Sequence, residues 1–236
     1  MARRRFTNLL ALAVLSCLNE RPMHPYEISQ TLRQRGKDQS IKLNYGALYS
    51  VVESLAKAGF VAPQETVREG RRPERTVYAI TDAGRDEHDA WLSELVSTPV
   101  REYHSLETAL ALILGLRPDD AVRLLGERVV NLKAELGRTD GLLKATREMG
   151  LADVFVVEEE FRRAMLAAEL AYVEGLVTAL RDDKLTGVAG WRKMHKLLAK
   201  GMTFEEILSD PVKHLGKEAA TFVPNLEQHS VPNLDH

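Results

Sequence analysis

The chain has 236 residues, 44% of them hydrophobic and 28% charged, with a formal net charge of −2. These values are ordinary for a soluble globular protein that forms one large domain or two small ones. No apolar run approaches the roughly 18 residues of a membrane span. The stretch from Leu9 to Leu18 lacks the small-residue cleavage site of a secretion signal. We therefore expect neither a membrane span nor a secretion signal.

The small net charge hides an asymmetry along the chain. Residues 1–85 contain 14 Lys and Arg against 8 Asp and Glu, a net charge of +6, whereas residues 86–236 carry −8. A basic first third joined to an acidic remainder indicates one module that faces nucleic acid and one that does not.

Cys17 is the single cysteine, so no disulfide can form within one chain. This usage suits the reducing cytoplasm, where we expect the protein to act. Among Ala13, Val14 and Leu18, the thiol is expected to be a small buried group, with redox sensing as the alternative.

The first 97 residues predict three helices, a hairpin and a fourth helix. The helices are expected at Thr7–Leu18, Tyr26–Gln34 and Asn44–Gly59, the strands at Gln64–Arg68 and Arg75–Ile80, and the N-cap of the fourth helix at Thr81. This order is that of a winged helix-turn-helix domain. Such a domain places its third helix in the major groove of DNA and its hairpin along the backbone or the minor groove.

The third predicted helix has two unlike faces. One face is apolar, with the i, i+3, i+4, i+7 spacing of a buried stripe: Leu48, Val51, Val52 and Leu55. The other face is expected to contact DNA through Asn44, Tyr45, Gly46, Tyr49 and Ser50, with Lys42 at the helix entrance. An ordinary solvated helix face is the alternative, against which two exposed tyrosines argue.

Arginines gather at the tip of the predicted hairpin. Arg68, Arg71, Arg72 and Arg75 fall within eight positions, interspersed with acidic residues. A solvated loop held by salt bridges is the usual explanation of such a charge run. Beside a candidate DNA-reading helix, the arginines instead favour contacts with phosphates or with a narrow groove.

Beyond Pro99 the sequence predicts a helical domain at residues 104–210. A short apolar helix at 105–115 precedes long helices at Pro118–Glu148 and about Val156–Arg181, and shorter helices follow at Trp191–Lys200 and after Thr203, which forms a capping box with Glu206. Residues 211–236 are expected to form an extended tail, since from about Thr221 proline and asparagine recur with few apolar residues.

Both long helices carry a seam of mostly apolar residues at alternating steps of three and four, as coiled coils do. The first seam is Val122, Leu125, Val129, Leu132, Leu136, Thr139, Leu143 and Thr146, and the second is Phe161, Met165, Ala168, Tyr172, Leu176 and Ala179. The pattern fits packing of the two helices on each other and packing against a partner chain equally well.

Five short segments stand out in the first third of the chain. They are His24-Pro25-Tyr26-Glu27-Ile28, Asn44-Tyr45-Gly46-Ala47-Leu48-Tyr49, Gly59-Phe60-Val61, Arg68-Glu69-Gly70-Arg71-Arg72-Pro73 and Val77-Tyr78-Ala79-Ile80-Thr81-Asp82-Ala83-Gly84. In order and spacing they resemble the PadR family of bacterial transcriptional regulators, especially actinobacterial members with an arginine-rich wing. The second half resembles, more loosely, the longer helical domain of the larger PadR-like branch. Ser50 and Pro25 depart from the commoner Pro and Gly, which bears on the operator sequence and not on the fold.

The resemblance implies a homodimeric repressor that binds an inverted-repeat operator in double-stranded DNA and dimerises through its helical domain. Family members often respond to an effector. For a small aromatic or hydrophobic effector, the candidate lining residues are Trp91, Phe161, Tyr172 and Trp191. The alternative is that all four are ordinary core or interface aromatics.

The sequence offers no catalytic, cofactor or metal-binding motif. Ser54-Leu-Ala-Lys57 has the letters of a Ser-x-x-Lys nucleophile motif but no companion motif, and the seven histidines show no paired metal-ligand spacing. We therefore expect a mainly α regulator and not an enzyme. Two rivals stay open, namely a winged-helix module that binds protein, and a ligand-binding helical protein that does not bind DNA.

Overall fold

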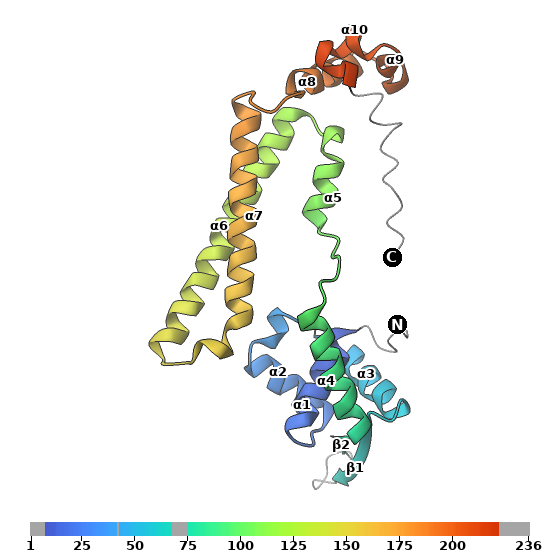
Figure 1. Ribbon diagram of the computed structural model, residues 1–236, viewed down its shortest axis with the longest axis vertical. Coiled ribbons are helices and arrows are strands. Elements are labelled where there is room, and N and C mark those ends of the chain that lie inside the picture. The colour runs from blue at the N-terminus through green and yellow to red at the C-terminus, as the bar shows by residue number, and fades with distance from the viewer. Residues whose placement is uncertain (1–7, 42, 68–74, 222–236) are drawn as a thin grey trace. The chain divides into compact units, whose positions relative to one another are not determined.

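The structure is a computed structural model that describes residues 8–41, 43–67 and 75–221. It is mainly helical with one small sheet, which confirms the expected fold class. The chain divides into two compact units between Glu102 and Tyr103 (Figure 1). Each unit has a hydrophobic core of its own. Among the described residues, no helix combines the length and the hydropathy that crossing a membrane requires.

The first unit confirms the predicted order of elements. It consists of α1 (Leu9–Glu20), α2 (Pro25–Gln34), the 3₁₀ turn η1 (Lys37–Gln39), α3 (Tyr45–Lys57), β1 (Val61–Val67), β2 (Arg75–Ile80) and α4 (Asp82–Ser97). Three helices, a hairpin and a closing helix make a winged helix-turn-helix.

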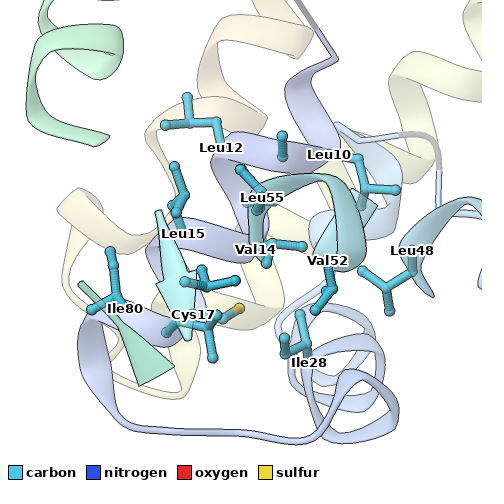
Figure 2. Packing of buried hydrophobic residues seen from close by; sticks show 14 of the residues in the cluster. Leu10, Leu12, Val14, Leu15, Cys17, Ile28, Leu48, Val52, Leu55 and Ile80 are labelled. Atoms are coloured by element: carbon cyan, nitrogen blue, oxygen red, sulfur yellow. The ribbon is translucent and has the colours of Figure 1, made fainter. Parts of the chain in front are cut away.

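Helix α1 is the centre of the first unit. It is buried on almost every side, because α2, α3, α4 and β2 all contact it. Figure 2 shows Val14 and Leu15 of α1 in one cluster with Val52 and Leu55 of α3. Since each fully buried Val or Leu side chain contributes roughly 1.5–3 kcal/mol, this cluster fixes where α3 lies.

Side chains accept hydrogen bonds from backbone amides in the first turns of helices in this unit. Thr81 Oγ1 accepts a hydrogen bond from Gly84 N at 3.1 Å, as the sequence predicts. At α2, His24 Nδ1 accepts from Tyr26 N at 3.1 Å, while Glu27 Oε2 accepts from His24 N at 2.8 Å. These bonds satisfy amide groups that the helices themselves leave unpaired.

The hairpin is an antiparallel pair in which Val61 lies opposite Ile80 and Val67 opposite Arg75. β1 begins three residues before the predicted Gln64. Pro63 does not end the strand, because it borders a shift in register where the regular ladder is already interrupted.

Gly84 permits a close approach between α4 and the start of the hairpin. A Cβ atom at this position would lie 2.0 Å from Phe60 O and 2.8 Å from Ile80 Cγ1. Only glycine fits there, since real Cβ atoms do not approach a carbonyl oxygen so closely.

The second unit contains the long helices of the chain. Its elements are α5 (Ser105–Ala111), η2 (Ile113–Gly115), α6 (Pro118–Glu148), η3 (Asp153–Phe155), α7 (Val157–Arg181), α8 (Val188–Leu198), α9 (Phe204–Ser209), α10 (Pro211–Leu215) and η4 (Lys217–Thr221). Helices α6 and α7 run side by side as a long hairpin (Figure 1). Leu125 and Leu132 of α6 share a core with Leu170, Val173 and Val177 of α7.

The predicted seam packs within the chain throughout α6 but only in part along α7, where Leu176 and Ala179 are half-buried. In α6 every seam position is buried or half-buried. In α7, however, Phe161, Met165 and Tyr172 are 68%, 48% and 59% exposed, and the buried stripe runs instead through Leu170 and Val177. Helix α7 carries two apolar stripes, and α6 covers only one of them, so the stripe with the larger side chains has no cover from α6.

The predicted extended tail is wrong for residues 211–221, which are helical. Pro211 occupies the first position of α10, where its missing N–H costs nothing, and Asp210 Oδ1 accepts from Lys213 N at 3.1 Å. Residues 222–236 lie outside the described residues. The predicted capping box at Thr203 and Glu206 is confirmed.

Candidate nucleic-acid interface

Helix α3 presents the two faces that the sequence predicts. Leu48, Val52 and Leu55 are at most 1% exposed, and Val51 is half-buried against the same core. On the other side, Tyr49 is 43% exposed, with exposed Ser50 and Glu53 beside it. The helix is therefore fixed through its apolar face and offers the polar face to solvent.

Asn44 has a structural role that the sequence analysis did not anticipate. It is the N-cap of α3, and its Oδ1 accepts a hydrogen bond from Gly46 N at 3.0 Å. Because the cap occupies the amide oxygen, Asn44 has its Nδ2 donors to offer a ligand. Such donors match acceptors such as phosphate oxygens or purine N7.

The hydroxyl of Ser50 is engaged within the helix. Ser50 Oγ donates to Gly46 O at 3.1 Å, and Ser54 Oγ repeats this arrangement with Ser50 O at 2.7 Å. A serine that donates to the preceding turn has its oxygen lone pairs to offer outward. Ser50 is thus suited to accept a hydrogen bond.

Tyr49 contacts the residue that caps the N-terminus of α2. Its ring meets the His24 ring edge-on, with centroids 6.1 Å apart and planes 71° apart. His24 is itself held by the capping box of α2, so the N-terminal turn of α2 fixes the aromatic side chain on α3. This role of His24 was not predicted from the sequence. The available signal was that His24, a possible helix cap, stands directly before Pro25.

Six of the predicted DNA contacts cannot be placed by their side chains. Lys42, Arg68, Arg71 and Arg72 lie outside the described residues, and Arg75 is described only by its backbone, at the start of β2. The side chain of Tyr45 is likewise not described, although its backbone begins α3. The register from Val67 to Arg75 does fix which residues join the strands: they are residues 68–74.

The four aromatic candidates for an effector site do not share a pocket. Trp91 is 4% exposed and belongs to the core of the first unit. Trp191 is 7% exposed, and its Nε1 donates to Leu116 O at 2.9 Å in the second unit. Phe161 and Tyr172 lie on the exposed stripe of α7, and Tyr172 and Trp191 line different hollows.

Cys17 is buried, as expected, and its environment disfavours the thiolate. Burial, with a smaller contribution from the nearby Glu20 carboxylate, raises the pKa of this thiol from 9.0 to about 11. A reactive cysteine needs the opposite shift, so the geometry supports the packing role over redox sensing.

Comparison with known proteins agrees with this geometry. The model of the transcriptional regulator PadR-like family matches residues 14–90. The structure is similar to that of Bacillus subtilis PadR in complex with operator DNA, with a TM-score of 0.61 and 18% identity over 73% of this chain and 99% of that chain.

Two further crystal structures are similar to this chain. Bacillus subtilis PadR in complex with p-coumaric acid has a TM-score of 0.60 and 17% identity, over 74% of this chain and 99% of that one. The PadR-like transcriptional regulator BC1756 from Bacillus cereus has a TM-score of 0.50 and 17% identity, over 76% and 99%. No curated protein matches the sequence. Residues 14–90 thus match the PadR-like family of transcriptional regulators, and most of the chain shares the fold of these crystal structures.

Proposed function

We propose that the protein is a homodimeric transcriptional repressor that binds an inverted-repeat operator and responds to a small ligand. The observation that carries the proposal is the exposed polar face of α3, which bears Tyr49 and begins at Asn44, on a winged-helix scaffold. The net charge of +6 over residues 1–85 supports contact with a polyanion. The likeness to a PadR crystallised with operator DNA supports the same choice.

In this proposal, α3 enters the major groove and the arginines of residues 68–75 contact the backbone or the minor groove. The Nδ2 donors of Asn44 and the hydroxyls of Tyr49 and Ser50 face the duplex. The N-terminus of α3 adds backbone amides, which favour a phosphate. Repression then follows from occupancy of a promoter.

The second unit supports a dimer because its apolar surface exceeds what one chain covers. Phe161, Met165 and Tyr172 form a stripe along α7 that α6 leaves exposed. Beside this stripe, α5 and α7 border a hollow of about 650 Å³, lined by Leu106, Leu110 and Leu166 among others. A long apolar stripe next to a hollow is typical of a surface that receives a helix from another chain.

Two-fold symmetry links the dimer to the operator. A symmetric dimer carries two copies of α3, which fit half-sites about one helical turn apart on one side of the duplex. Two conformations of the dimer would differ in the distance between the two copies of α3. A ligand that binds one conformation more tightly than the other would change the affinity for the operator.

The test is a binding titration with genomic fragments that the purified protein retains. Reversal of both Arg71 and Arg72 to Glu should abolish binding, whereas Lys193→Glu with Lys196→Glu, an equal charge change on exposed positions of α8, should leave most of it. If about six phosphates are neutralised per dimer, affinity should fall on the order of 10³-fold between 50 and 200 mM salt. Equal affinity for the two double variants, or a flat salt response, would favour the protein-binding rival.

A further inference from the structure

A cavity of about 170 Å³ lies in the second unit, away from the α7 stripe. Residues of η2, α8, α10, η4 and the turn before α8 enclose it. Its inner wall consists of Val188, Trp191 and Met194, which are 3%, 7% and 4% exposed. It is therefore an apolar cavity within a folded core, and none of the proposed DNA contacts lines it.

Hydrogen bonds between elements hold the walls of this cavity. Trp191 Nε1 donates to Leu116 O at 2.9 Å, and His195 Nε2 lies 2.9 Å from Leu114 O, so α8 is tied to η2 and to the residue that follows it. On the far side, Gly187 N donates to Glu218 Oε2 at 3.2 Å and joins η4 to the start of α8. Walls fixed in this way make a preformed site, which small ligands favour.

The volume and the lining residues of the cavity indicate which class of ligand would fit. An engineered protein cavity of about 150 Å³ accepts benzene, so this cavity has room for one ring and a short substituent. Of the described lining residues, Glu218 alone is charged, and the Thr186 hydroxyl adds a second polar group. A carboxylate at the edge favours a ligand with a cation or a hydrogen-bond donor and disfavours an organic acid.

We propose that this cavity binds a small single-ring molecule that carries an amine or a hydroxyl group. The ring packs on Trp191 and Met194, and the polar group points to Glu218. As a ligand site the cavity stands by itself, whereas its role as an effector site rests on the function proposed above.

A ligand in the cavity would contact a segment that connects two helices of the second unit. Ile113 and Leu114 of η2 form part of the wall, and η2 directly follows α5, the first helix after the junction at residues 102–103. A bound ring therefore stabilises one conformation of the segment that leads from α5 into α6. Effector coupling of typical size would change operator affinity by at least about fivefold.

The experiment uses Trp191 as the reporter. The chain has two tryptophans, so Trp91→Phe leaves Trp191 as the single source of tryptophan fluorescence. Benzylamine, benzyl alcohol and benzoate are titrated as probes of similar size. We expect benzylamine to change the emission with a dissociation constant on the order of 10⁻³ M or below, since ligands of this size bind weakly. Benzoate should bind at least about fivefold more weakly than benzylamine, because one exposed charge contributes up to about 1 kcal/mol.

Three variants test the assignment. Thr186→Phe adds a ring at an exposed lining position and should abolish binding, while Thr178→Phe, at an exposed position of α7 that does not line the cavity, should not. Glu218→Gln keeps the acceptor for Gly187 N but removes the charge, so it should equalise the affinities of the amine and the alcohol. Ligand-observed NMR on the unmodified protein gives the same comparison should Trp91→Phe fail to fold.

The outcomes separate the two claims. Absence of binding by all three probes, or unchanged binding in Thr186→Phe, overturns the ligand site. Binding of benzylamine without a change in operator affinity overturns the effector role and leaves the ligand site. Failure of the protein to bind any DNA overturns the proposed function, while the probe titration still decides the cavity.

Discussion

The two units handle their large apolar side chains in opposite ways. In the first unit, α1 is enclosed on nearly all sides, and most of the exposed aliphatic side chains lie in the last turns of α4. In the second unit, α7 buries one apolar stripe and exposes another with larger side chains. The first unit therefore has the core of a self-sufficient domain. The second exposes an apolar stripe that the dimer proposed above would cover.

The strongest way to break this comparison is to place charge on the exposed stripe. Phe161→Glu combined with Tyr172→Glu should raise the dimer dissociation constant by at least about 100-fold, because the new carboxylates would be buried without partners. Sedimentation equilibrium measures it. Phe161→Leu with Tyr172→Phe, which keeps the stripe apolar, is the matched control. An unchanged dissociation constant in the charged variant would mean that another surface joins the subunits.

A pair of glycines sharpens the contrast between a tight and an open unit. Gly84→Ala would place Cβ 2.0 Å from Phe60 O, so we expect a loss of about 1–3 kcal/mol in the free energy of unfolding. Gly137 lies within α6 with no atom near an added Cβ, and Gly137→Ala should gain about 0.5–1 kcal/mol. Urea unfolding compares the two. Equal effects of the same sign would contradict the close approach at Gly84.

The pH dependence of stability tests how well the first core is sealed. Burial raises the pKa of Cys17 to about 11, above the 9.0 of a free thiol. Above pH 9 the unfolded chain loses this proton while the folded chain keeps it, so the contribution to stability is complete below pH 9. It then declines by at most about 1.4 kcal/mol per pH unit up to pH 11. Cys17→Ala should lack this part of the decline, and parallel pH curves for both proteins would show that water reaches the thiol.

The smallest expected effect separates the two roles of Asn44. Asn44→Ala removes the α3 cap and should cost about 1 kcal/mol of stability. Asn44→Asp keeps a capping oxygen but turns a donor into a charged acceptor, so stability should hold while operator affinity falls. Thermal unfolding and a binding titration give the two numbers. Full operator affinity in Asn44→Asp would place the start of α3 away from the duplex.

Much of the fold could be predicted from local signals. Pro118 and the long run of helix formers after it predicted the bounds of α6. Thr81 and Thr203 predicted helix starts, because capping depends on only a few neighbouring residues. The sequence left open whether the predicted α7 seam meets α6 or another chain, because two apolar stripes on one helix look alike in sequence. Which of them meets α6 depends on three-dimensional packing.

The candidate site was predictable in outline and not in its bonding. The exposed face of α3 follows from the spacing of Leu48, Val52 and Leu55. The edge-on contact between His24 and Tyr49 joins two helices, so no local pattern reveals it. The cavity beside Trp191 combines residues from Ile113 to Ala219, a separation that periodicity does not span.

Hydroxyl-radical footprinting of a retained genomic fragment tests the central claim most directly, namely that two copies of α3 read one face of a duplex. The account predicts two protected patches related by a dyad, with centres roughly 10 base pairs apart. It also predicts that both patches disappear together in the Phe161→Glu, Tyr172→Glu variant. A single protected patch, or two patches that persist in that variant, would contradict it.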